Sequence, residues 1–131
     1  MKTYELEEKI RAALIGNEDL IAVLPLGEKA IYHYVAPTVE PKRYPIIVYA
    51  PIVDVPALIG DDCEIVHRVT IEIYVIAMLK RFEADKQRFI AACDLLPNIM
   101  ETLGFVRLKT TPTREDGKLT YVFEFVKNEL C

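Results

Sequence analysis

Apolar and polar side chains alternate along the segment from Glu64 to Ala77, and this is the clearest pattern in the chain. The positions in register with the apolar side are Ile65, His67, Val69, Ile71, Ile73, Val75 and Ala77. A period of two predicts a β-strand with one buried face, which is typical of antiparallel or mixed sheets with one covered face. The opposite side becomes apolar at Tyr74, Ile76 and Met78, so we expect that end of the strand to contact protein on both faces.

Two other segments have helical spacing. The first follows Thr3, a candidate N-cap, and ends at Gly16; its apolar positions are Leu6, Ile10, Ala13 and Leu14. Asn17 offers a second cap, for a short helical turn that stops near Pro25. The second segment runs from Arg81 to Leu103 before Gly104, with a stripe of Phe82, Phe89, Cys93, Leu96, Met100 and Leu103. Pro97 lies inside it, so we expect the helix to bend or break there.

Further strands are predicted at Ala30–Val35, Ile46–Ala50, Phe105–Lys109 and Leu119–Lys127. The last two flank the turn-prone TPTREDGK and predict a terminal hairpin. This order of elements favours an α+β fold, a mainly antiparallel sheet of four or five strands with two or three helices packed on one face. A length of 131 residues predicts one domain, residues 1–131.

Charge and hydropathy narrow the functional classes. The formal net charge is −4, and charges of both signs are mixed along the chain. A general nucleic-acid binder needs Lys and Arg clustered on one face, so the sequence argues against that class. Charge or proline interrupts the apolar runs well before the roughly 20 residues that a membrane span needs. The start, MKTYELEEKI, has the pattern of an acidic helix rather than a signal peptide. We therefore expect a protein that folds in a cytoplasm, without membrane or nucleic-acid sequence recognition.

No residue pattern identifies a catalytic, cofactor or metal site. Cys63, Cys93 and Cys131 are far apart and are expected to be reduced thiols. His33 and His67 lie on separate predicted strands, and we interpret His67 as a hydrogen-bonded residue at the edge of the core rather than a catalytic one. The acidic residues near Asp61 lack the spacing of a calcium loop, which favours a solvated turn. We expect a protein that is not an enzyme and needs no cofactor.

Three stretches carry a family resemblance when they are taken in order. They are LEEKIRAALIGNEDLIAVLPLGEKAIYHYVAP, YPIIVYAPIVDVPALIGDDCEIVHRVTIEIYVIA and METLGFVRLKTTPTREDGKLTYVFEF. Each motif is short, and together they resemble the tail-completion or head–tail joining proteins of long-tailed bacteriophages and prophages over nearly the whole chain. Gly60 stands where an alanine-like residue is more usual before the acidic pair, and Cys63 follows that pair directly.

The resemblance implies a structural protein, similar to tail terminators that cap the tail tube as a ring, usually of six subunits, and join it to the head. Its partners would be further copies of itself, the tail-tube protein and a head-completion or connector protein. The expected locations are the bacterial host cytoplasm during assembly and then the virion neck or tail.

An assembly protein of this kind would use its surface loops and its exposed sheet face. We predict polar loops at Val53–Asp62 and Thr110–Lys118. The candidate loop contacts are Asp54, Asp61, Asp62, Arg114, Glu115 and Asp116, and the candidate sheet-face contacts are Arg68, Glu72 and Tyr74.

Two alternatives remain. One is a head-side connector or minor capsid component of the same neck. The other is a small-molecule binding domain or enzyme that uses His67 with Glu72 or Asp62.

Overall fold

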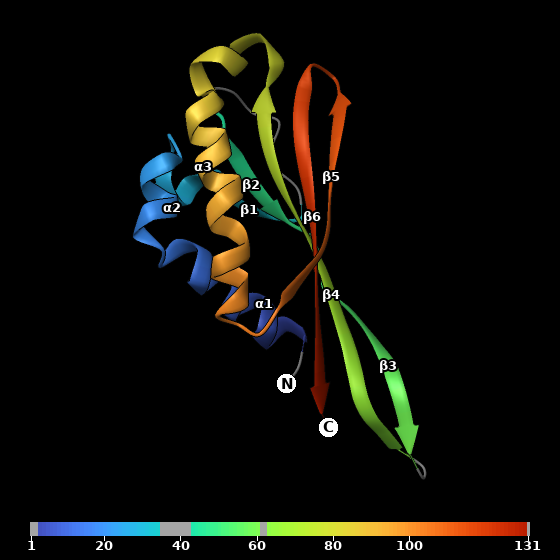
Figure 1. Ribbon diagram of the computed structural model, residues 1–131. Coiled ribbons are helices and arrows are strands. Elements are labelled where there is room, and N and C mark those ends of the chain that lie inside the picture. Colours follow the sequence, from blue (N-terminus) through green and yellow to red (C-terminus); the bar gives the residue numbers. More distant parts are fainter. Residues whose placement is uncertain (1–2, 35–42, 61–62, 131) are drawn as a thin grey trace.

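A computed structural model describes residues 3–34, 43–60 and 63–130 and shows a two-layer α+β fold. One layer contains the helices α1 (Thr3–Ile15), α2 (Glu18–Val23) and α3 (Phe82–Glu101), which lie on one side of the sheet (Figure 1). The other layer contains β1 (Ile31–His33), β2 (Ile46–Tyr49), β3 (Val53–Gly60), β4 (Cys63–Met78), β5 (Val106–Glu115) and β6 (Lys118–Leu130). Short 3-10 turns at Gly27–Ala30 and Leu79–Arg81 precede β1 and α3. The predicted fold class is therefore confirmed, with six strands in place of four or five.

Strand β4 organises the sheet. The order is β1-β2-β4-β6-β5, all antiparallel except the β1–β2 pair. Along one edge of β4, β2 pairs with Ile73–Ile76 and β3 pairs with the segment 63–70, while β6 follows the other edge from Val66 to Met78. β2 and β3 thus share one edge of the same strand, one after the other.

The alternation in β4 corresponds to a covered and an exposed side of the sheet. Val69, Ile71, Ile73, Val75 and Ala77 are all buried against the helical layer. The positions between them are more exposed, and we call the side that carries Arg68, Glu72 and Tyr74 the open face. At the far end of β4, half-buried Tyr74 and Ile76 pair with buried residues of β2, so the prediction of contacts on both faces there is confirmed.

The helix ends follow local sequence signals. The Asn17 side chain accepts a hydrogen bond from the Leu20 N–H at 2.9 Å, as expected of an N-cap. After α3, Gly104 adopts a left-handed conformation (φ 88°), and the N–H groups of Gly104 and Phe105 donate to the carbonyls of Glu101 and Met100. This is the Schellman pattern that a glycine permits.

One helix prediction is wrong in part. We expected Pro97 to bend or break the helix; α3 continues through it to Glu101, so the helix does not break there. Leu96, Ile99 and Met100 around the proline are all buried. Because their packing holds this stretch of helix, it tolerates the one backbone hydrogen bond that proline cannot make.

The two predicted polar loops are mostly strands. Val53–Gly60 is β3, and the second loop prediction, from Thr110, overlaps β5 as far as Glu115. Only Asp116 and Gly117 connect β5 to β6, and both have positive φ, as a two-residue hairpin turn requires. β3 and β5 each lie at an edge of the sheet, and β3 and the part of β5 from Thr110 lack the apolar alternation of a half-buried strand. Both segments are strands because each pairs with a longer neighbouring strand, β3 with β4 and β5 with β6.

Candidate functional site

The most prominent feature is an arm that projects past the helical layer (Figure 1). We define the arm as β3 together with the segment 63–70 of β4, which it pairs with. The last pair between β4 and β6 is Val66 with Leu130, so the outermost part of the arm is a two-stranded ribbon. Val53 and Val55 are 59% and 44% exposed at the base of the arm, where β4 also pairs with β6. Such a ribbon offers apolar side chains and a strand edge for pairing.

A side-chain contact joins the two strands of the arm. The Nδ1 atom of His67 lies 3.1 Å from the Oδ1 atom of Asp54, and both side chains are about 29% exposed. The interpretation of His67 as a hydrogen-bonded residue is confirmed. Glu72 lies an odd number of positions along β4 and therefore projects from the opposite face. The structure does not bring His67 and Glu72 together, and Asp62 lies outside the described residues.

The three sheet-face candidates, Arg68, Glu72 and Tyr74, share the open face. Glu72 is directly opposite Glu124 of β6, and Glu124 lies 3.6 Å from the Lys109 amino group of β5. Two carboxylates in direct register repel each other, and one lysine offsets this only partly. Partial burial, with a smaller contribution from Glu72, raises the pKa of Tyr74 above its usual value. This face therefore combines half-buried apolar side chains with charges of both signs, since Arg68 and Lys109 share it with Glu72 and Glu124.

The other candidates fall into separate places. Arg114 and Glu115 end β5 and Asp116 begins the turn, all exposed, at the opposite end of β4 and β6 from the arm (Figure 1). Asp54 belongs to strand β3 rather than to a loop. Asp61 and Asp62 lie outside the described residues. The structure thus divides the predicted contacts between the arm, the open face and the β5–β6 end, and does not form one cluster from them.

Strand β5 is a second exposed edge. In the part of the chain that the structure describes, it pairs with β6 alone. Val106 and Leu108 are 66% and 59% exposed. Proline and several basic residues interrupt this strand, as they often do on edges that must not pair freely.

His33 forms a contact that the sequence pattern did not indicate. Its Nε2 atom lies 3.2 Å from the Oε2 atom of Glu7 on α1, at ion-pair distance but outside hydrogen-bond geometry. The other carboxylate oxygen of Glu7 accepts a hydrogen bond from the Ile52 N–H at 3.2 Å. The His33 ring also stacks on Tyr49 at 4.4 Å. These contacts connect α1 to the sheet, which makes His33 a structural residue.

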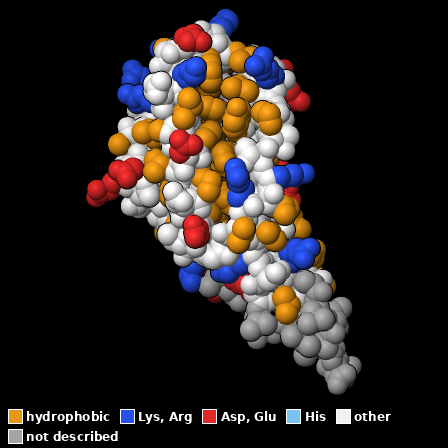
Figure 2. Space-filling view, viewed as in Figure 1, with side chains coloured by type: hydrophobic (Ala, Val, Ile, Leu, Met, Phe, Trp, Pro, Cys, Tyr) orange, Lys and Arg blue, Asp and Glu red, His pale blue; other side chains and the backbone are white. Residues whose placement is uncertain are grey.

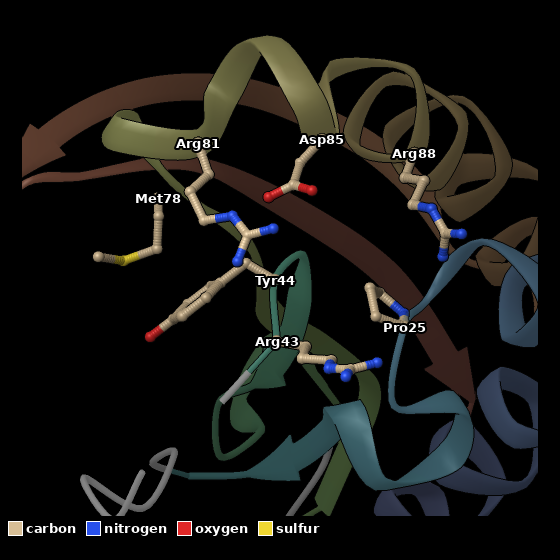
Figure 3. Close-up of a pocket in the computed structure, with 7 residues that line it drawn as sticks. All are labelled: Pro25, Arg43, Tyr44, Met78, Arg81, Asp85 and Arg88. Atoms are coloured by element: carbon tan, nitrogen blue, oxygen red, sulfur yellow. The ribbon is translucent and has the colours of Figure 1, made fainter. Parts of the chain in front are cut away.

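A cavity of about 600 Å³ opens where the start of α3 meets the segment before β2. Figure 3 shows Arg81, Asp85 and Arg88 extending from the α3 side and Arg43 from the opposite side, so that their charged ends surround the hollow. We call it the arginine pocket; its lining residues are Pro25, Arg43, Tyr44, Met78, Arg81, Asp85 and Arg88. They come from three separate stretches of sequence, at 25, 43–44 and 78–88, so no single local motif indicates the whole pocket.

Apolar surface also lies near this end of the molecule. Figure 2 shows hydrophobic side chains gathered over the upper half of one face, beside α3 and over the neighbouring strands, with Lys and Arg side chains around them. Leu79 and Ile90 are 38% and 41% exposed. Exposed apolar surface of this kind is a common feature of protein contacts.

Nowhere in the ranges 3–34, 43–60 and 63–130 do three or more His, Cys, Asp or Glu side chains group in a way that could hold a metal ion. Across the same ranges, no helix has both the length and the hydrophobicity to cross a bilayer. No family model matches the chain, and no curated protein matches it either.

Proposed function

We propose that this protein is a structural subunit that assembles into a ring, caps a bacteriophage tail tube and joins the tail to the head. The observation that carries the proposal is the arm, a strand ribbon that extends beyond its own domain and exposes valines and a strand edge. The family resemblance of the sequence supports the same function.

A ring of identical subunits needs two different complementary surfaces on each chain, so that each contact leads to the next and the series closes. The arm is one such surface, because it projects from one end of the molecule. The exposed apolar and charged surfaces at the other end are available for the second. Six copies would form the ring, and its two sides would contact the tail-tube protein and a head-completion or connector protein.

The function needs a rigid scaffold with accessible edges rather than a catalytic group. Strand pairing along β4 and the Asp54–His67 contact stiffen the arm. The charged side chains of the open face and of the β5–β6 turn would set register and encounter rate with the partners more than affinity.

The test is the oligomeric state of the protein, alone and with the tail-tube protein of the same genome. Light scattering with reductant present, followed by negative-stain microscopy, should show closed rings. A double variant, Val53→Asp with Val55→Asp, should remove them. Tyr4→Asp is the matched control, because Tyr4 is 56% exposed on α1 and belongs to neither strand of the arm.

Two outcomes would contradict the proposal. A wild-type protein that stays monomeric both alone and with the tube protein would refute ring assembly. Binding to a head-side connector but not to the tube would favour the head-side neck component instead.

A further inference from the structure

We infer that the arginine pocket binds a chain of phosphate groups, such as tripolyphosphate or the phosphates of a nucleoside triphosphate. The inference goes beyond the proposed function and does not depend on ring assembly. It rests on three arginines that extend toward one hollow from two sides (Figure 3).

The pocket concentrates positive charge on a chain whose formal net charge is −4. Among its described lining residues, Arg43, Arg81 and Arg88 face a single carboxylate, that of Asp85. In the part of the chain that the structure describes, none of the three guanidinium groups forms an ion pair. Like charges that converge without a counter-ion repel each other, so the pocket favours an anion from outside the chain.

Phosphate complements this set of arginines better than a carboxylate does. A guanidinium group donates through a planar fork that pairs with two oxygens of either anion. A carboxylate has only two oxygens, in one plane, whereas a phosphate group directs its oxygens to several sides and carries more negative charge. Because Arg43 extends from the side opposite Arg81 and Arg88 (Figure 3), a ligand must accept hydrogen bonds from both sides.

The spacing of the arginines favours several phosphate groups over one. Arg81 precedes the first residue of α3 and Arg88 lies two turns further on, so at about 1.5 Å per residue their backbones are about 10 Å apart. This is wider than one phosphate group. The volume of the pocket, about 600 Å³, also lies in the range for ligands larger than a single small anion. A chain of phosphates can contact both of these arginines and Arg43 at once.

The remaining lining residues leave room for an organic group. Tyr44 is buried and Pro25 and Met78 are half-buried, so they form a less polar side of the hollow. Such side chains pack against the apolar part of a ligand. Tripolyphosphate and ATP carry the same phosphate chain, so their affinities separate its contribution from that of a nucleoside.

Asp85 provides a test that loss of structure cannot imitate. It lies four positions after Arg81 and three before Arg88, so the three side chains share one side of the helix. Its carboxylate is the one negative charge among the described lining residues. Asp85→Asn should therefore tighten the binding of tripolyphosphate by about two- to fivefold, because it removes a repulsion at a solvated site.

Titration calorimetry with tripolyphosphate measures the affinity. Arg81→Gln with Arg88→Gln should weaken binding at least about tenfold, because it removes two charge-assisted contacts. Arg81→Lys with Arg88→Lys should lose less, since it keeps the charge without the planar fork. Lys80→Gln with Lys86→Gln is the matched control, because both lysines are exposed near the pocket without lining it. Circular dichroism checks that each variant is folded.

Several outcomes would overturn the inference. One is the absence of binding at about 1 mM tripolyphosphate; another is an equal loss of affinity in the lysine control, which would indicate a general charge effect. Citrate that binds as tightly as tripolyphosphate would make carboxylate the ligand chemistry. A DNA duplex that binds more tightly than both phosphate probes would make a nucleic-acid backbone the ligand.

Two outcomes would support the inference and identify the source of the phosphates. Tighter binding of ATP than of tripolyphosphate would assign the less polar side of the pocket to a nucleoside. Equal affinities, both lost in the Arg81→Gln, Arg88→Gln variant, would identify the phosphate chain alone as the ligand.

Discussion

Replacing Ile73 with alanine should cost about 4 kcal/mol of unfolding free energy, whereas replacing its neighbour Glu72 with alanine should change it by less than about 0.5 kcal/mol. The two residues are adjacent in β4 and project from opposite faces of the sheet. The comparison therefore tests the assignment of a covered and an open face with two changes in the same strand.

The magnitude follows from the surroundings of Ile73. Its side chain is 0% exposed, and it pairs with Tyr49 of β2 and Phe123 of β6, which are 2% and 3% exposed. Strands on both sides hold the backbone in place, so the structure cannot collapse into the space that the isoleucine leaves. This places the cost in the upper part of the range of about 2–5 kcal/mol for such truncations, equivalent to about a thousandfold change in the folding equilibrium.

Urea unfolding followed by circular dichroism measures both changes. With a slope of about 2 kcal/mol per molar urea, the midpoint for Ile73→Ala should fall by about 2 M. The Glu72→Ala midpoint should stay close to that of the wild type, because this side chain is exposed and lies opposite a second glutamate. Each measurement is repeated at two protein concentrations, since subunit association would add to the apparent stability. Equal midpoint shifts for the two variants would refute the assignment of faces.

Three further changes test individual features. Asn17→Ala should lower the unfolding free energy by about 1 kcal/mol, because it removes the cap bond to the Leu20 N–H; urea unfolding measures it, and an unchanged midpoint would contradict it. Gly104→Ala should lower the unfolding free energy more than Gly117→Ala does in the same assay. Both glycines have positive φ, but a new Cβ at Gly104 would lie 3.2 Å from the Lys127 side chain, whereas one at Gly117 would have nothing within 4 Å. Burial, with a smaller effect of Asp94, raises the pKa of the Cys93 thiol to about 12. In a chain with Cys63→Ser and Cys131→Ser, its alkylation rate should therefore keep rising with pH beyond about 9, where a free cysteine levels off. A plateau there would contradict the burial of this thiol.

The sequence predicts those helices and strands that have one buried face, because their apolar residues recur at the spacing of a helix or a strand. The alternation in β4, the stripe of α3 and the cap at Asn17 all correspond to the structure. In these elements the choice of an apolar or polar residue follows from burial, because a strand buries every second residue and a helix buries one face in each turn.

The strand predicted at Phe105–Lys109 and the terminal hairpin correspond to the start of β5 and to its pairing with β6. β3 and the rest of β5, from Thr110 to Glu115, could not be recognised in this way. β3 contains Pro56 and ends at Gly60, and the exposed residues of β5 include Pro112. Neither strand has a continuous buried side, so nothing in their own sequence required alternation. Each forms because a long neighbour, β4 or β6, offers a complete row of hydrogen-bonding groups, and that information lies in another part of the chain.

The arginine pocket was missed for a related reason. Arg43 and Arg81 are far apart in sequence, and only the pairing of β2 with the end of β4 brings their segments together. The charge pattern along the chain looks evenly mixed. A concentration of one sign becomes visible only once the sheet order is known.

The replacement of a predicted loop by a strand also changes how a ring would form. A flexible loop could meet the next subunit at many angles, which allows open chains of subunits as easily as closed ones. Here β4 continues without interruption from the arm to Met78, one of the residues that line the arginine pocket. One hydrogen-bonded strand thus fixes both the distance and the direction between the arm and the opposite end of the molecule. In the proposed assembly the twist of the sheet, rather than loop rearrangement, would set the angle between neighbouring subunits and therefore the number that closes the ring.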